Sequence, residues 1–274
     1  GLMPSRAHPV IYIPFQRLPK WLNAFIWKCG LFALSKTIKP TILQRRKELG
    51  LPVDKELVEY ILPADQIIYA SDERIAPIPK DLRPATAVGF FYLPQEQELD
   101  PQLLEFIAAG PKPIYVGFGS MTDKNPEKTT RMLIKAAVNA GVRLVLSSGW
   151  ANLGKGAIHD SVHVIGPVSH ERLFPLMGGI VHHGGAGTTA AAARSGRPQT
   201  IVPHLLDQFF WAHRIEQLKV GPPGRWKLWL TERSLTQIFE QMTLPQYEAN
   251  AQDLALAVNR EDGLAKAASL IEQL

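Results

Sequence analysis

A glycine-rich turn between an apolar strand and a helix-forming run constrains this chain more than any other feature. The apolar residues that end at Val181 predict a buried strand, and the turn His182-His183-Gly184-Gly185-Ala186-Gly187-Thr188-Thr189 follows directly. The run from Ala190 to Arg194 then predicts a helix. Backbone N–H groups at the start of a helix lack intrahelical partners and, with the helix dipole, stabilise an anion such as a diphosphate. The turn therefore predicts an anion site at the end of a strand.

Residues 113–274 alternate strand and helix patterns, which is typical of an α/β fold with a parallel sheet covered on both faces. This region is therefore predicted to be one Rossmann-like domain. The pattern predicts strands at 114–118, 143–147, 162–165, 179–182 and 199–202, and helices at 126–140, 170–177 (broken near Pro175), 208–218, 234–242, 245–259 and 262–274.

Residues 1–95 differ from the rest, being basic and mostly helical with two short strand candidates at 66–69 and 86–90. Two strands and a few helices do not complete an α/β layer by themselves. Residues 96–112, which include a predicted helix at 102–109, are expected to link the two parts. The last helix is expected to pack back on the N-terminal part.

A second pair of glycines, Gly117 and Gly119, follows the first strand of the 113–274 region, and Ser120 could donate its hydroxyl to a phosphate there. A dinucleotide fingerprint would require a third glycine where this chain has Thr122, and an acid about 20 residues further on. The next strand ends in Ser147-Ser148-Gly149 without an acid. A nicotinamide dehydrogenase is thus disfavoured, and the glycines alone also fit an ordinary strand-to-helix turn.

Two further groups of polar residues have both a structural and a functional interpretation. Asp207 and Gln208 could form an ordinary helix start, but beside a phosphate site a carboxylate and an amide suit the vicinal hydroxyls of a sugar. Thr188 and Thr189 could cap a helix, bind phosphate, or do both. Adjacent His182 and His183 point to opposite faces of a strand and lack a third ligand, so no metal site is predicted. One imidazole is expected in the core, and one fits a donor to phosphate.

Residues 1–50 contain nine Lys and Arg residues against one acid, Glu48, with several aromatic residues between them. Such a segment could lie on an anionic membrane surface, or it could be a solvated basic face over a helical core. Nucleic acid is disfavoured because no base-reading motif accompanies the charge. The apolar run 21–34 is too short to span a bilayer, and no signal-peptide layout is visible, so a cytoplasmic location, peripheral on the membrane, is expected. The single Cys29 excludes an internal disulfide.

Short motifs occur in a fixed order along the chain. They are Val116-Gly117-Phe118-Gly119-Ser120-Met121, Ser148-Gly149-Trp150, His163-Val164-Ile165-Gly166-Pro167-Val168, the turn after Val181, Gly196-Arg197-Pro198-Gln199, Pro203 with Asp207-Gln208, Trp211-Ala212 and Val220-Gly221-Pro222. This series resembles the donor half of GT-B fold glycosyltransferases, in the branch of sterol glucosyltransferases and bacterial natural-product glycosyltransferases. Residues 1–93 are similar to the end of the acceptor domain, through a long helix across 23–51 and the segment from Pro77 to Phe91.

The resemblance implies roles for particular residues. His182 is expected to contact the donor diphosphate, with Ser120, Gly185, Gly187 and Thr188 nearby. Asp207 and Gln208 are expected to hold the sugar hydroxyls, and Val168 and Trp150 to contact the base. Plant relatives carry a glutamate that binds the ribose where this chain has Ala190. The resemblance therefore does not decide whether the donor nucleotide is UDP or TDP.

The implied activity is transfer of a hexose from a UDP- or TDP-sugar to a hydroxyl of a lipophilic acceptor such as a sterol, without a metal ion or other cofactor. The family's catalytic histidine follows the first strand of the acceptor domain, and no segment here corresponds to it, so no catalytic residue is assigned. His8 lies in the wrong segment. The alternative is a nucleotide-sugar-binding half that needs a separate N-terminal piece. Self-association through exposed apolar surface is also expected.

Overall fold

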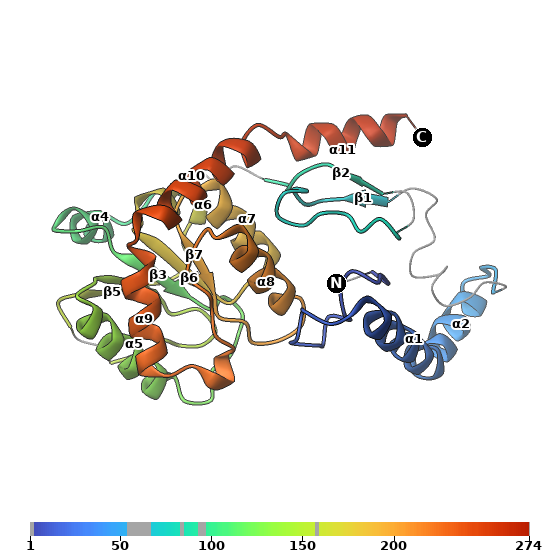
Figure 1. The fold of residues 1–274 in the computed structure, drawn as a ribbon, viewed down its shortest axis with the longest axis horizontal. Helices are drawn as coiled ribbons and strands as arrows, with labels where there is room; N and C mark the ends of the chain where they lie inside the picture. Colours follow the sequence, from blue (N-terminus) through green and yellow to red (C-terminus); the bar gives the residue numbers. More distant parts are fainter. Residues whose placement is uncertain (1–2, 54–66, 83–84, 93–96, 157–158, 274) are drawn as a thin grey trace.

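A five-stranded parallel sheet forms the centre of the larger part of the structure (Figure 1). The structure is a computed structural model that describes residues 3–53, 67–82, 85–92, 97–156 and 159–273. The strands lie in the order β5-β4-β3-β6-β7. Their bounds are β3 (Ile114–Gly117), β4 (Leu144–Ser147), β5 (Val162–Ile165), β6 (Gly179–His182) and β7 (Gln199–Ile201).

The two faces of the sheet are covered by different helices because successive strand residues point to opposite sides. Ile114 and Val116 pack with residues of α5 (Pro126–Ala140) and α9 (Glu232–Met242). Tyr115, between them, packs on the other side, against residues of α4 (Pro101–Ala108), α6 (His170–Leu173) and the 3-10 turn Phe174–Leu176. Strands buried on both faces are continuously apolar, as the sequence of β3 shows. The predicted parallel α/β sheet is confirmed.

The strand order places a topological switch point between β3 and β6. From β3 the chain runs outward through β4 and β5, then crosses to β6 and β7 on the other side. Gly117 at the end of β3 lies in register with His182 at the end of β6. In open parallel sheets, ligands bind at the carboxyl ends of the strands at such a point. The glycine turn after β6 continues into α7 (Ala186–Arg194) at this edge.

Two further helices are α8 (Gln208–Leu218) and α10 (Pro245–Val258). Both pack with α7 in a second core cluster. A short 3-10 turn, η2 (Lys227–Trp229), precedes α9. A Cβ on Gly224, just before η2, would clash with the carbonyl oxygen of Ile201. The loop before η2 therefore lies directly on the end of β7.

The N-terminal part contains α1 (Lys20–Thr37), α2 (Lys39–Glu48) and a two-stranded parallel sheet of β1 (Ile67–Tyr69) and β2 (Ala85–Ala87). The last helix, α11 (Gly263–Glu272), runs beside this small sheet (Figure 1). Arg74 donates a hydrogen bond to the carbonyl oxygen of Ala257 at 2.9 Å, and its guanidinium lies 3.8 Å from the carboxylate of Glu261. These contacts join the C-terminal segment to the N-terminal part. The predicted strand at 66–69, the predicted linker at 96–112 and the predicted helix at 262–274 each include one residue outside the described part of the chain, namely 66, 96 and 274.

The prediction of one long helix across residues 23–51 is wrong. The helix ends at Thr37 and a second begins at Lys39, with Ile38 between them. Pro40 explains the break, because its ring lacks an N–H and clashes with the carbonyl group one turn earlier. Within the part of the chain that the structure describes, we find no helix that is both long and apolar enough to cross a bilayer.

Candidate functional site

Three loops meet at the carboxyl edge of the sheet, where the strand order predicts a ligand. The backbone N–H of Trp150 donates a hydrogen bond to the carbonyl oxygen of Gly119 at 3.0 Å. A Cβ on Gly149 would lie 2.7 Å from that same oxygen. Gly119 and Gly149 also have positive φ angles of 56° and 49°, which residues with a side chain rarely adopt. The glycines are therefore required for this close approach of two loops.

The imidazole of His183 lies between the loop after β3 and the loop after β6. A Cβ on Gly119 would be 2.7 Å from Cε1 of His183, and a Cβ on Gly185 would be 2.8 Å from its Nε2. Both glycines thus leave room for the ring. The residue is only 8% exposed, and its Nδ1 is a buried polar atom without a hydrogen-bond partner. Because such atoms are normally paired in folded proteins, this unpaired nitrogen distinguishes His183 from the other polar residues of the site.

A cavity of about 380 Å³ opens at this edge, and His183 is part of its wall. Its walls come from the ends of β3, β4 and β5, from the start of α6, and from the turn into α7. The lining residues are Tyr115, Gly117, Gly119, Ser147, Ser148, Gly149, Trp150, Gly166, Pro167, Val168, His170, His183 and Thr188. The predicted site residues Trp150, Val168 and Thr188 are among them.

His182, to which the resemblance assigned the diphosphate contact, lies in the interior and is absent from the cavity wall. Its Nδ1 accepts a hydrogen bond from the N–H of Gly184 at 3.2 Å, and its Nε2 lies 3.0 Å from Oε1 of Gln199. The Nε2–H is then the donor to Gln199. Burial lowers the pKa of His182 to about 3, so its ring is neutral at pH 7. Both ring nitrogens of His182 are therefore engaged in hydrogen bonds within the protein, whereas the neighbouring His183 lines the cavity.

Asp207 lies close enough to His183 to influence its charge state. Burial lowers the pKa of His183, while the carboxylate of Asp207 acts in the opposite direction. Asp207 also accepts a hydrogen bond from Nε1–H of Trp211 at 2.9 Å. Gln208 is buried, and its Oε1 accepts hydrogen bonds from the N–H groups of His204 at 2.7 Å and Leu205 at 3.1 Å. In this structure its amide oxygen fixes the loop before α8.

The remaining predicted residues lie next to the cavity in the chain without lining it: Ser120, Gly185 and Gly187. Gly187 has no steric requirement for glycine, since a Cβ there would meet nothing within 4 Å and its φ is not positive. Ala190 is 2% exposed and packs in the core cluster around α8 and α10. A ribose contact would have to come from another position.

Two wall residues, Tyr115 and His170, were not singled out from the sequence. The Nε2 of His170 lies 3.3 Å from the hydroxyl of Tyr115, and its ring stacks on Phe174 with centroids 4.4 Å apart. Burial lowers the pKa of His170 to about 4. A sequence signal existed, since His170 closely follows the Gly166-Pro167 turn that ends β5, at the same sheet edge. Grouped His, Cys, Asp and Glu side chains of the kind that bind a metal are not found among the described residues.

Comparison with known proteins gives concordant matches. Residues 132–262 match the family described as erythromycin biosynthesis protein CIII-like, C-terminal domain. The chain is 37% identical over 206 residues to sterol 3-beta-glucosyltransferase UGT80A2 of Arabidopsis thaliana, an alignment that covers 73% of this chain and 32% of that protein. It is also 37% identical over 227 residues to vancomycin aglycone glucosyltransferase of Amycolatopsis orientalis, covering 82% of this chain and 54% of that protein.

Among solved structures, the glycotransferase of kitacinnamycin superposes with a TM-score of 0.72 at 19% identity, covering 97% of this chain and 68% of that one. Spinosyn forosaminyltransferase SpnP superposes with a TM-score of 0.69 at 18% identity. These likenesses show a common fold. The two curated relatives are longer, and the chain spans 32% of one and 54% of the other.

Proposed function

The chain belongs to the glycosyltransferases that share the EryCIII-like C-terminal domain, and from this membership we propose that its sheet-edge cavity holds the nucleotide diphosphate of a sugar donor. Its fold is of the GT-B type, as the sequence predicted. One observation carries the proposal furthest: the unpartnered Nδ1 of buried His183 lies at the topological switch point, between two glycine loops.

We assign the diphosphate contact to His183 instead of His182. A neutral imidazole with a free ring nitrogen can donate to a phosphate oxygen, and the start of α7 offers unpaired N–H groups and Thr188 beside it. These groups would stabilise the charge that develops on the leaving diphosphate, the task that a metal ion performs elsewhere. Trp150, which is 71% exposed and lines the same cavity, offers a flat face to the base.

Asp207 lies near enough to His183 to influence its charge state, and we propose that it holds the sugar that follows the diphosphate. Its carboxylate can accept hydrogen bonds from sugar hydroxyls. We propose a hexose, probed as UDP-glucose or TDP-glucose, and an acceptor hydroxyl on a lipophilic molecule such as a sterol. This class of acceptor is supported by the names of two relatives, one a sterol glucosyltransferase and the other an aglycone glucosyltransferase. The alternative is a donor-binding half that requires another polypeptide segment to supply the catalytic base.

Titration calorimetry of the chain with UDP and with TDP, in EDTA, tests the donor site. A mass-detected transfer assay with UDP-glucose, TDP-glucose and a sterol then separates the two functions. Turnover by this chain supports the transferase and contradicts the binding half, whereas binding without turnover supports the binding half. If the folded chain binds neither nucleotide, both proposals are wrong. Loss of binding in EDTA that Mg²⁺ restores would contradict metal independence.

Replacing Gly187 by alanine should raise stability and weaken UDP binding at the same time. Alanine is the better helix former, so the free energy of unfolding should rise by up to about 1 kcal/mol. The added methyl group would approach an anion at the start of α7, and we expect about tenfold weaker binding. Urea denaturation and calorimetry measure the two effects.

Gly30→Ala is the matched control for this variant, because Gly30 lies within α1 and a Cβ there would meet Val10 at an ordinary 3.6 Å. The control should not alter UDP binding. If both glycine variants bind UDP like the unaltered chain, no ligand uses the space beside Gly187.

We further infer that α1 lies against an anionic membrane surface. Trp21, Phe25 and Phe32 are 71%, 59% and 66% exposed, and their spacing places them on one side of the helix. The ammonium group of Lys36 lies 5.7 Å from the ring centroid of Phe32, so basic and aromatic groups occur together. Exposed aromatic rings beside lysines suit the interface of an anionic bilayer.

Co-sedimentation with vesicles tests this inference. Vesicles that contain phosphatidylserine should bind the chain severalfold more tightly than pure phosphatidylcholine vesicles, and a Trp21→Ser, Phe25→Ser double variant should bind less. Leu228→Ser, at a residue 73% exposed outside α1, serves as control. Equal binding to both vesicle types, or no binding, would leave α1 as a solvated basic face.

A further inference from the structure

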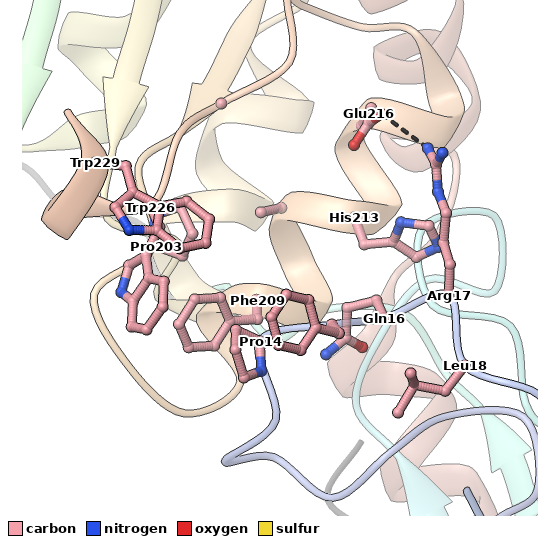
Figure 2. Close-up of a pocket in the computed structure, with 13 residues that line it drawn as sticks. Pro14, Gln16, Arg17, Leu18, Pro203, Phe209, His213, Glu216, Trp226 and Trp229 are labelled. Carbon is pink, nitrogen blue, oxygen red and sulfur yellow. Dashed lines mark hydrogen bonds and ion pairs between the residues drawn. The ribbon is translucent and has the colours of Figure 1, made fainter. Parts of the chain in front are cut away.

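A second and larger cavity, of about 510 Å³, lies outside the proposed donor site (Figure 2). One wall is the N-terminal segment 14–18. The other walls are one face of α8 and the loop that leads into η2. The segments that form it are about 190 residues apart in the chain, so the cavity exists only because the N-terminal segment lies against α8.

Four aromatic side chains line this cavity: Phe15, Phe209, Trp226 and Trp229. Trp226 meets Phe209 edge to face with centroids 5.4 Å apart, and it meets Trp229 at 5.2 Å. Its Nε1–H donates to the carbonyl oxygen of His204 at 3.3 Å, which fixes the indole in place. Phe15 and Trp229 are each 61% exposed. Large rings held open around a concave space are typical of a binding site for an apolar ligand.

The opposite end of the cavity is polar. Figure 2 shows the two tryptophans at one end and the ion pair of Arg17 and Glu216 at the other, where the charged atoms are 2.9 Å apart. His213 lies beside this pair, and its pKa is lowered, by burial first and then by Arg17. Its neutral ring can accept a hydrogen bond from a hydroxyl group. The cavity therefore suits a molecule with an extended apolar body and a polar end.

Residues 203–209 contribute to this cavity and also come near His183 of the proposed donor site. Pro203 and Phe209 line the aromatic cavity, while Asp207, between them in the chain, influences the charge state of His183 in the donor cavity. A sugar held by Asp207 would thus lie between the two cavities. This placement is what a transfer from a nucleotide sugar to an apolar molecule requires, since the two substrates must approach the same sugar carbon.

We propose that this aromatic cavity binds the acceptor, a rigid fused-ring or aryl alcohol whose flat faces lie against Trp226 and Trp229. The assignment rests on the proposed function, because it takes the occupant to be the acceptor of the sugar held in the neighbouring site. Aromatic side chains supply large apolar contact areas and favour ring systems over flexible acyl chains.

Binding of dehydroergosterol, a fluorescent fused-ring alcohol delivered from cyclodextrin, tests the proposal through the polarisation of the sterol's own emission. Trp229→Ala and Phe15→Ala should each weaken binding by about tenfold, as expected for loss of one aromatic contact. Leu228→Ala is the matched control, because Leu228 is exposed beside Trp229 and does not line the cavity. Trp21→Ala controls for sterol adsorbed on α1. Neither control should change the affinity.

Each outcome of this titration either supports or contradicts the proposed acceptor site. If Trp229→Ala and Phe15→Ala are folded by circular dichroism and bind like the unaltered chain, the site is wrong. If Trp21→Ala alone weakens binding, the sterol lies on α1, and if the unaltered chain binds no sterol, the ligand class is wrong. A parallel UDP titration separates the two proposals: UDP binding should survive in Trp229→Ala. If the unaltered chain does not bind UDP, the proposed donor site is wrong. The sterol titration would still show whether the aromatic cavity binds a sterol.

Discussion

Replacing His183 by alanine is expected to weaken UDP binding by about ten- to a hundredfold and to lower the free energy of unfolding less than the same change at His182 does. The factor is that of one hydrogen bond to a charged group. The Nδ1 of His183 has no hydrogen bond for the substitution to break, so only the packing of its ring is lost, whereas His182 also has partners on both ring nitrogens. Calorimetric titration with UDP and urea denaturation of the same variant measure the two quantities.

The adjacent residue supplies the contrasting variant. His182→Ala removes a buried ring with partners on both nitrogens, and it leaves the N–H of Gly184 and the amide of Gln199 unpaired. The free energy of unfolding should fall by about 3 kcal/mol or more. Any His182→Ala chain that remains folded at low temperature should bind UDP more tightly than His183→Ala does. The reverse order would return the diphosphate contact to His182.

Acid is expected to destabilise the fold well before carboxylates titrate. Burial lowers the pKa of His182 to about 3, and it lowers those of His8, His170 and His204 to about 4. The same side chains take up a proton near pH 6.5 in the unfolded chain. Stability is therefore fully present above pH 6.5 and falls as the pH drops below it, because only the unfolded state binds the proton.

For the fully buried His182 the loss is about 1.4 kcal/mol per pH unit below 6.5, or about 2 kcal/mol at pH 5. The other three histidines change stability in the same direction. Urea titrations at pH 7 and pH 5 should show a decrease of several kcal/mol. His8→Leu, which removes a ring packed edge to face against Phe210, should flatten this dependence. Equal unfolding free energies at the two pH values would contradict the buried, neutral state of these rings.

The sequence predicted the large sheet well because its signals are local. Continuous apolar runs identified β3 and β6, and the limits of α5 and α8 agree with the predicted ranges because Asn125 caps α5 and Asp207 precedes α8. The break at Ile38 was also readable from Pro40. A proline one turn into a helix has a well-defined effect, because it lacks an N–H and its ring clashes with the preceding turn.

The choice between His182 and His183 illustrates what a sequence alone leaves open. Alternation along a strand shows that two neighbours point to opposite faces, but it does not show which face is which. That choice depends on how the chain turns after β6, and hence on close contacts of Gly119 and Gly185 with one imidazole. The aromatic cavity could not be predicted from the sequence either, because Phe15 and Trp229 come to line one cavity only through tertiary packing.

At the donor cavity, Gly119, Gly149 and Gly185 leave room for neighbouring backbone and for the ring of His183, which brings the loops into contact. Backbone loops fixed in this way lose their conformational freedom when the chain folds. An arriving anion then meets groups that are already in position, so little ordering opposes its capture. Association should proceed at a rate set by diffusion and orientation, and improved nucleotide affinity in engineered variants should come from slower release.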